Sequence, residues 1–257
     1  MYKSLLTFIL TALSLQALAV TVLIDPGHGG DDHGAKGSYS VGHGKKKSKV
    51  DIKEKDLTLA IAKKVKELLS PHCHAYLTRS LDKNLSLEKR AEVAETIKAD
   101  LFVSIHVNSS HSSSAHGFET YYLDNHDDAA VRKVEEVENK MSGGAGEEAV
   151  IRQILTDLVV SRTVTSSKAL ATSIHQEVGK VLPKKFKLTD RGIRPGLFYV
   201  LALSKRPAVL LEAGFLSNEK ELAKMNSEKF QDEYARAVAE GIKKFIKTRY
   251  KSPVSLF

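Results

Sequence analysis

Short apolar runs alternate with longer amphipathic segments along most of this chain of 257 residues. Apolar runs rich in β-branched side chains predict buried strands over residues 20–25, 74–78, 101–106, 117–123, 198–203 and 208–211. Apolar positions that recur every three or four residues predict helices over 54–70, 86–97, 166–182 and 228–247, with Pro71 and Pro183 ending two of them. This alternation predicts one α/β domain.

Two stretches depart from the alternation. Residues 29–53 are rich in glycine and lysine and have no periodicity, which predicts a surface loop. Residues 124–165 read as an inserted pair of amphipathic segments, 127–141 and 150–159, separated by a glycine-rich break. At about 100° per residue, Glu138 falls inside the apolar stripe of the first segment, whereas Glu135 and Glu136 lie off it. A carboxylate on a buried face requires a cation or a route to solvent, and the pattern leaves both open.

The two ends of the chain are expected to lie outside the folded domain. Residues 1–19 have the features of a secretory signal peptide: Lys3, an apolar stretch over residues 5–18, and the A-x-A-like sequence Ala17-Leu18-Ala19. The alternative is an uncleaved membrane anchor. We therefore expect an exported protein, periplasmic or secreted in a bacterium, with its domain over residues 20–250 and a tail over 251–257.

Composition narrows the choice of partners. The formal net charge is +8, which suits an anionic polymer such as cell wall or a lipid headgroup surface. Nucleic acid fits the charge but not export, and no groove-reading motif is present. Cys73 is the only cysteine, so the chain can form neither an internal disulfide nor a thiolate zinc cluster.

Polar side chains at the ends of predicted strands and helices are the candidates for chemistry. His28 follows the first strand, His106 ends another, and Glu212 follows the strand over 208–211, while Glu54 opens the first helix. Ligand sites of open α/β sheets lie at the carboxyl ends of the strands, so both histidines can converge there. Two imidazoles and one carboxylate form a catalytic zinc site with an open position, and a second carboxylate can carry a proton. The spacing alone does not establish such a site, and Glu54 could equally be a helix N-terminal acid.

A resemblance assigns these roles. The chain resembles the zinc-dependent N-acetylmuramoyl-L-alanine amidases of bacterial cell walls in a series of segments in the same order: VLIDPGHGGDDHGAKG, KEKDLTLAIAKKVKELL, LTRSLDKNLSLEKRAEVAE, ADLFVSIHVNSS, GFETYYL, FYVLALSKRPAVLLEAGFLSN and AEGI. It implies a single α/β domain with a mostly parallel twisted sheet and helices on both faces. By position in these motifs, His28, Glu54 and His106 would be the Zn²⁺ ligands and Glu212 the catalytic glutamate, acting on the amide between N-acetylmuramic acid and L-alanine.

The same resemblance gives the insertion a role. In division-associated members, an inserted helix covers the zinc until an activator protein moves it, and a glutamate of that helix binds the metal. Glu138-Asn139 resembles that Glu-Asn pair, so Glu138 is expected to be an autoinhibitory zinc contact within the helical insertion at 124–165. The expected partners are peptidoglycan, or its muropeptide and lipid-linked precursors, and an activator. His33, Glu95 and the basic stretch 45–49 depart from the pattern, which leaves the grip on sugar and peptide open.

Two other interpretations compete with the amidase. Ser-x-x-Lys occurs at Ser80, Ser86 and Ser217, as in penicillin-binding serine carboxypeptidases, but no SDN or KTG companion accompanies it. A catalytically silent wall-binding scaffold is the third interpretation. Loss of a ligand or of Glu212 would be its signature, and all four residues are present.

Overall fold

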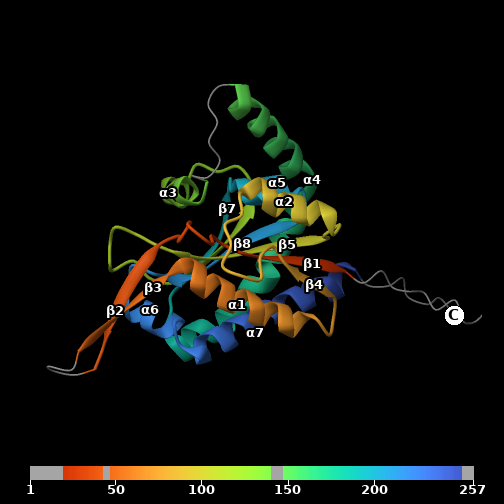
Figure 1. Ribbon diagram of the computed structural model, residues 1–257. Coiled ribbons are helices and arrows are strands. Elements are labelled where there is room, and N and C mark those ends of the chain that lie inside the picture. The colour runs from red at the N-terminus through yellow and green to blue at the C-terminus, as the bar shows by residue number, and fades with distance from the viewer. Residues whose placement is uncertain (1–19, 43–46, 140–146, 251–257) are drawn as a thin grey trace, which may run out of the picture.

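The computed structural model describes residues 20–42, 47–139 and 147–250, except for the side chains of 147–153 (Figure 1). The expected signal peptide and the tail at 251–257 lie outside these residues. A six-stranded sheet crosses the molecule in the order β4-β1-β5-β8-β6-β7. Its strands are β1 (Thr21–Pro26), β4 (His74–Leu77), β5 (Leu101–Asn108), β6 (Phe118–Leu123), β7 (Asp190–Gly196) and β8 (Ala208–Phe215).

The sheet is mostly parallel. β4, β1, β5 and β8 run in one direction, β6 pairs with β8 antiparallel, and β7 runs parallel to β6. The carboxyl ends of β1, β5 and β8 therefore lie at the same edge as the beginning of β6. Side chains that leave the sheet at this edge can meet, as expected for a ligand site in an α/β sheet.

Helices cover both faces, which confirms the α/β class. In the view of Figure 1, α1 (Glu54–Leu69), α6 (Glu219–Met225) and α7 (Glu228–Arg249) lie below the sheet, and α2 (Leu87–Thr96) and α5 (Tyr199–Ser204) lie above it. α4 (Glu147–Phe186) contributes to both apolar cores: its first half packs with α5 and its second half with α7. α3 (Ala129–Glu138) lies beside β7, next to the functional edge.

Local sequence explains where these helices begin and end. Leu57, Ile61, Val65 and Leu69 recur on one face of α1 and are buried against the sheet, and Pro71 follows the helix end. The side chain of Ser86 caps α2 by accepting a hydrogen bond from the backbone of Lys89. These predictions from the sequence are confirmed.

Four predictions about the helices and strands were wrong. Residues 198–203 form α5 rather than a strand, because a short apolar run buried on all sides carries no periodicity that separates the two. Residues 29–53 are not all loop: β2 (Lys36–Val41) and β3 (Ser48–Lys53) pair as an antiparallel hairpin. Tyr39 and Ile52 pack one face of this hairpin on the core, while lysines occupy the other.

Pro183 does not end its helix either. It lies inside α4, which continues to Phe186 before the backbone of Lys187 bonds back to the Pro183 carbonyl. The second segment of the predicted insertion is the beginning of this same 40-residue helix, not a separate element. In the described residues, no helix is long and apolar enough to span a membrane.

Candidate metal centre

The turn after β1 brings His28 to the edge of the sheet. His28 has a left-handed backbone with φ of 59°. Two glycines allow close packing around the histidines. A Cβ atom on Gly27 would lie 2.5 Å from Cε1 of His106, and one on Gly34 would lie 2.5 Å from Cδ2 of His28. Any side chain at these positions would displace the imidazoles.

The sheet register aligns three further polar residues. His106 of β5 lies beside Glu212 of β8, and Glu212 lies opposite Glu119 of β6. All three are buried, and Glu212 is completely inaccessible to solvent. Neighbouring residues in register point to the same face of a sheet. The row therefore places Glu212 next to His106, and Glu119 on the far side of Glu212, on the face that carries α2 and α5.

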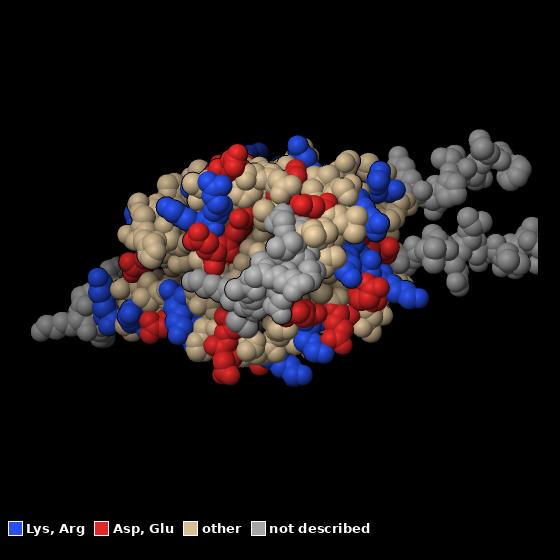
Figure 2. Space-filling view, turned by 90° about the horizontal axis from the view of Figure 1, so that it is seen from above, with Lys and Arg blue, Asp and Glu red and all other residues tan. Residues whose placement is uncertain are grey.

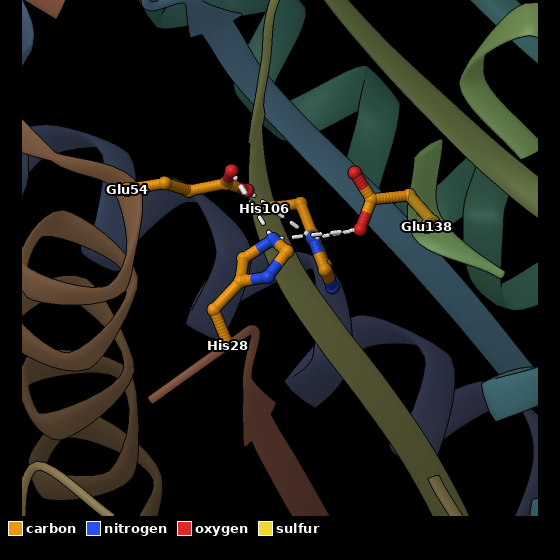
Figure 3. Close-up of side chains that lie close together, drawn as sticks. All are labelled: His28, Glu54, His106 and Glu138. Carbon is orange, nitrogen blue, oxygen red and sulfur yellow. Dashed lines mark ion pairs between the residues drawn. The ribbon is translucent and has the colours of Figure 1, made fainter. Parts of the chain in front are cut away.

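Four side chains from four segments converge on one point (Figure 3). One ligand atom from each of His28, Glu54, His106 and Glu138 lies within 4.8 Å of the others. The closest approaches are His28 Nε2 to Glu54 Oε2 at 3.1 Å and to Glu138 Oε2 at 3.5 Å, and His106 Nδ1 to Glu54 Oε1 at 3.2 Å and to Glu138 Oε2 at 2.8 Å. In the described part of the chain, this is the only such group of histidines and acids.

The donor atoms fit a metal ion. Nε2 of His28 and Nδ1 of His106 are buried and have no hydrogen-bond partner among the described residues, although both face the common point. Imidazole nitrogens and carboxylate oxygens in a compact, buried group suit a divalent transition metal ion. The structure therefore supports a metal-binding group at this edge, and the identity of the metal belongs to the proposal below.

Without a metal, protons balance the charge of this group. Burial opposes the charged form of His28, but the negative charge of Glu54 and the hydrogen bond that His28 donates to Asp32 outweigh it and raise the pKa of His28 to about 10. For His106, burial is likewise outweighed, here by Glu138 and Glu54, and the pKa rises to about 10. Burial would raise the pKa of Glu54, but His28 and His106 hold it below its usual value. The group is thus arranged around a positive charge at its centre.

Glu212 differs from the other acids. Both of its carboxylate oxygens are buried without a hydrogen-bond partner in the described residues. Burial first, and then the negative charges of Glu138, Glu54 and Glu119, raise its pKa well above the usual value for a glutamate. A carboxyl group whose pKa is raised by burial and by neighbouring acids is a candidate for general acid–base catalysis.

Sequence reasoning missed the residues that support this group. Oδ2 of Asp32 lies 2.9 Å from Nδ1 of His28, the ring nitrogen opposite the metal-facing one. Such a carboxylate fixes the orientation of a ligating histidine. Asp32 comes four residues after His28 in a loop, where the sequence has no periodicity that could have pointed to it. Glu119 is held by Arg191 and by the Tyr121 hydroxyl, contacts that only the strand pairing reveals.

α3 carries Glu138 and is attached mainly through polar contacts. Asn139, directly after α3, donates to the carbonyl of Leu197 and accepts from the backbone N–H of Tyr199 at 2.9 Å each. Glu135 pairs with His126 at 2.6 Å and accepts from the backbone of Leu197. The prediction that Glu135 lies off the buried face was wrong, because this polar pocket, not an apolar core, receives it.

The Ser-x-x-Lys pairs show no catalytic arrangement. Ser86 is the cap of α2, and the Ser217 hydroxyl accepts from the backbone of Ser110. Ser86 accepts from the backbone N–H of Lys89, but within the described residues no serine hydroxyl of these pairs is hydrogen-bonded to the ammonium group of its lysine. The geometry gives the serine carboxypeptidase interpretation no support.

Residues 22–244 match a family model described as N-acetylmuramoyl-L-alanine amidase. The chain belongs to this amidase family. It is 34% identical over 229 residues to the N-acetylmuramoyl-L-alanine amidase AmiA of Escherichia coli, and the match covers 86% of this chain and 74% of that protein.

Solved structures of the amidase family have the same fold. An N-acetylmuramoyl-L-alanine amidase from Clostridium difficile 630 is 30% identical, with a TM-score of 0.65, and the match covers 90% of this chain and 99% of that one. The CwlD amidase from Clostridioides difficile, solved in complex with the GerS lipoprotein, is 29% identical with a TM-score of 0.65 over 89% and 99% of the two chains. The chain is therefore a peptidoglycan amidase, with a single α/β catalytic domain.

The surface around the centre of this amidase has mixed charge. Seen from above, acidic and basic side chains are interspersed on the face that includes α3 and α4, and no patch of a single sign dominates it (Figure 2). The net positive charge of the chain is thus not concentrated on this face.

Proposed function

We propose that the chain hydrolyses the amide between N-acetylmuramic acid and the L-alanine of the stem peptide, with Zn²⁺ held by His28, Glu54 and His106. The observation that carries this proposal is the pair of buried, unpartnered imidazole nitrogens that face Glu54 next to the unpartnered carboxyl group of Glu212. Zinc bound there supplies a Lewis acid that polarises the scissile carbonyl and lowers the pKa of water towards neutrality.

Glu212 is the proton carrier of the proposed reaction. As a carboxylate it accepts the proton of the attacking water, and as an acid it returns that proton to the leaving amine of L-alanine. Its burial and its acidic neighbours support both steps, because they raise its pKa well above the usual value for a glutamate and so favour uptake of a proton. Asp32 holds the His28 ring so that Nε2 faces the centre.

Glu138 is the autoinhibitory contact of this proposal. Its carboxylate lies 2.8 Å from Nδ1 of His106 and 3.5 Å from Nε2 of His28, so it would take a coordination position that water and substrate need. A fourth ligand from the protein is typical of structural zinc sites, whereas catalytic sites keep this position open. The arrangement described here is thus an inactive state, and α3, within the insertion at 124–165, has to move for catalysis.

An activator protein is the proposed cause of that movement. The first half of α4 exposes Ile154, Leu155 and Leu158, whose accessible fractions are 62%, 46% and 47%. A cavity of about 260 Å³ between α4 and α5 lies beside them and includes Tyr199, whose backbone holds Asn139. Exposed apolar side chains of this kind mark protein interfaces, and the related CwlD amidase was solved with a lipoprotein partner.

The proposed setting is the cell wall of a bacterium, during remodelling and division. The expected substrates are peptidoglycan and its muropeptide or lipid-linked precursors, and the expected location is the periplasm or the exterior. The signal-like residues 1–19 and the export-compatible cysteine usage support this proposal.

The test is release of free stem peptide from purified peptidoglycan. The wild-type chain, or a form freed from α3, is expected to release peptide only without a chelator, and Glu212→Gln is expected to be inactive. Glu92→Gln is the matched control, since the Glu92 side chain is 61% exposed and pairs with Lys89 on the surface. Activity that survives both the chelator and Glu212→Gln would refute the zinc mechanism.

A further inference from the structure

Arg79 is a buried arginine beside the metal-binding group. It follows β4 and is only 3% exposed. In the described residues, its hydrogen-bond partners are four main-chain carbonyls and one hydroxyl, and no carboxylate lies within ion-pair distance. Nε donates to Pro26, Nη1 to Leu81, and Nη2 to Gly27, Lys55 and the Thr58 hydroxyl. A buried guanidinium whose N–H groups donate to main-chain carbonyls fixes the position of the backbone and does not neutralise a nearby carboxylate.

One nitrogen of Arg79 joins the two segments that carry His28 and Glu54. Nη2 donates to the carbonyl of Gly27 at 2.8 Å and to the carbonyl of Lys55 at 2.9 Å. Gly27 directly precedes His28, and Lys55 directly follows Glu54. The Thr58 hydroxyl of α1 adds a second link, since it donates to the same Gly27 carbonyl at 2.9 Å. The turn after β1 and the first turn of α1 are therefore tied together next to both side chains.

Arg90 holds the same turn in a different way. It donates to the carbonyls of Pro26 and His28 at 2.9 Å each and pairs with buried Asp25 at 2.7 Å. Its remaining partner is the carbonyl of Leu85, just before its own helix α2, so none of its partners lies on α1. Arg79 is thus the arginine that couples the turn to the helix carrying Glu54.

This coupling matters because the two side chains come from unrelated elements. Metal ions accept deviations of only about 0.2 Å from their preferred ligand distances. His28 lies in a left-handed turn outside the sheet ladder, and Glu54 at a helix end, where fraying begins. A main-chain link between them reduces the reorganisation that metal binding would otherwise require.

We propose that Arg79, assisted by Thr58, is a positioning residue that presets the distance between His28 and Glu54 for metal binding. This inference rests on the proposed metal centre. It predicts that the forked geometry of the guanidinium matters, and not its charge alone. Arg79→Lys keeps the charge but cannot reach Gly27, Lys55 and Pro26 together.

The experiment measures zinc affinity by competition with a chromophoric chelator, alongside thermal unfolding of the metal-free proteins. Arg79→Lys is expected to weaken zinc binding about 10- to 100-fold, as loss of other outer contacts to metal ligands does. Thr58→Val, which is nearly isosteric, is expected to weaken it less than tenfold and to shift the visible spectrum of the Co²⁺-substituted protein. Arg206→Lys, a surface change far from the centre, is expected to bind zinc like wild type.

Three results overturn the inference. If Arg79→Lys and Thr58→Val lower the unfolding temperature but leave the zinc constant unchanged, Arg79 is a structural residue only. If Arg79→Lys does not fold, the Thr58→Val protein provides the test. Wild-type zinc affinity of Thr58→Val, together with an unchanged spectrum of its Co²⁺ form, would reject the positioning role. If the wild-type chain itself binds no zinc, the proposed metal centre fails and this inference fails with it, whereas equal affinities of wild type and variants leave the centre intact.

Discussion

The framework that carries His28, Glu54 and His106 and the α3 cover that carries Glu138 are built differently. The framework belongs to buried strands and to α1, whose apolar face is completely enclosed, and arginines bind its backbone. Besides the contact of Glu138 with the two histidines, α3 buries Val131, packs Val134 partly beside it, and relies on polar contacts at Asp128, Glu135 and Asn139. Burial of a valine contributes about 1.5–3 kcal/mol and each such hydrogen bond about 1 kcal/mol. The cover can therefore leave at a cost of a few kcal/mol, whereas the framework cannot.

Glu212→Gln tests the framework and has the largest expected effect. An amide cannot accept the proton of the attacking water, so peptide release should fall by about 10²–10⁴-fold. Zinc content should remain near that of wild type, since Glu212 is outside the group of metal-facing atoms. Retained turnover at wild-type zinc content would remove Glu212 from the mechanism.

Removal of residues 127–141 tests the cover. Because Glu138 would take a coordination position at the proposed centre, the deletion is expected to raise amidase activity without an activator, by about tenfold or more if opening costs 1.4 kcal/mol or more. Unchanged or lost activity in a protein with an intact circular dichroism spectrum would contradict autoinhibition.

Single changes on α3 separate the metal contact from the helix itself. Glu138→Gln is expected to raise activity several-fold, because a neutral amide binds zinc more weakly than a carboxylate. Glu136→Gln is the matched control, since Glu136 is exposed on the same helix. Equal stimulation by both changes would indicate a general loosening of α3 rather than release of the metal.

Glu135→Gln tests how α3 is attached to the rest of the domain. The change removes the carboxylate that pairs with His126 and accepts a hydrogen bond from the backbone N–H of Leu197. We expect this loss to destabilise the docked position of α3 by about 1–3 kcal/mol. Basal activity should rise, but less than after the deletion. Hydrogen exchange of the α3 amides should accelerate, while that of β5 stays unchanged, and faster exchange in both would show that the two regions unfold together.

The pH dependence of the metal-free protein is the smallest expected effect. His28 and His106 have folded-state pKa values of about 10, above their ordinary value of 6.5. A raised folded-state pKa contributes stability that is complete below about pH 6.5 and is lost as pH rises towards 10. The chelated protein should thus melt a few degrees lower at pH 9 than at pH 6.5, and the zinc-loaded protein should lack this decline. A flat profile with chelator would contradict the protonated pair.

The sequence predicted the framework better than the cover, for physical reasons. β1 and β5 are short buried runs that end at or near histidines, so strand ends and motif resemblance together placed His28 and His106 at one edge. The periodicity of 54–69 placed Glu54 at a helix start, as found. Glu212 was expected after its strand, but β8 continues to Phe215 and places it within the sheet, opposite Glu119.

The residues that surround the centre could not be read from the chain. Arg79 and Asp32 act through backbone and ring contacts between segments, which leave no periodic trace. Glu135 was misjudged because a helical wheel assumes an apolar partner, whereas α3 docks on the backbone of residues 197–199. α5 was misjudged because its apolar run is buried all round.

The most direct test of the central claim is a crystal structure of the zinc-soaked full chain with anomalous data at the zinc edge. The account predicts one strong anomalous peak within coordination distance of Nε2 of His28, Nδ1 of His106 and a carboxylate oxygen of Glu54, with Glu138 as the fourth ligand. In the variant lacking residues 127–141, the peak should remain and the coordination position of Glu138 should be free. No peak at this point, or a peak bound by other residues, would contradict the account.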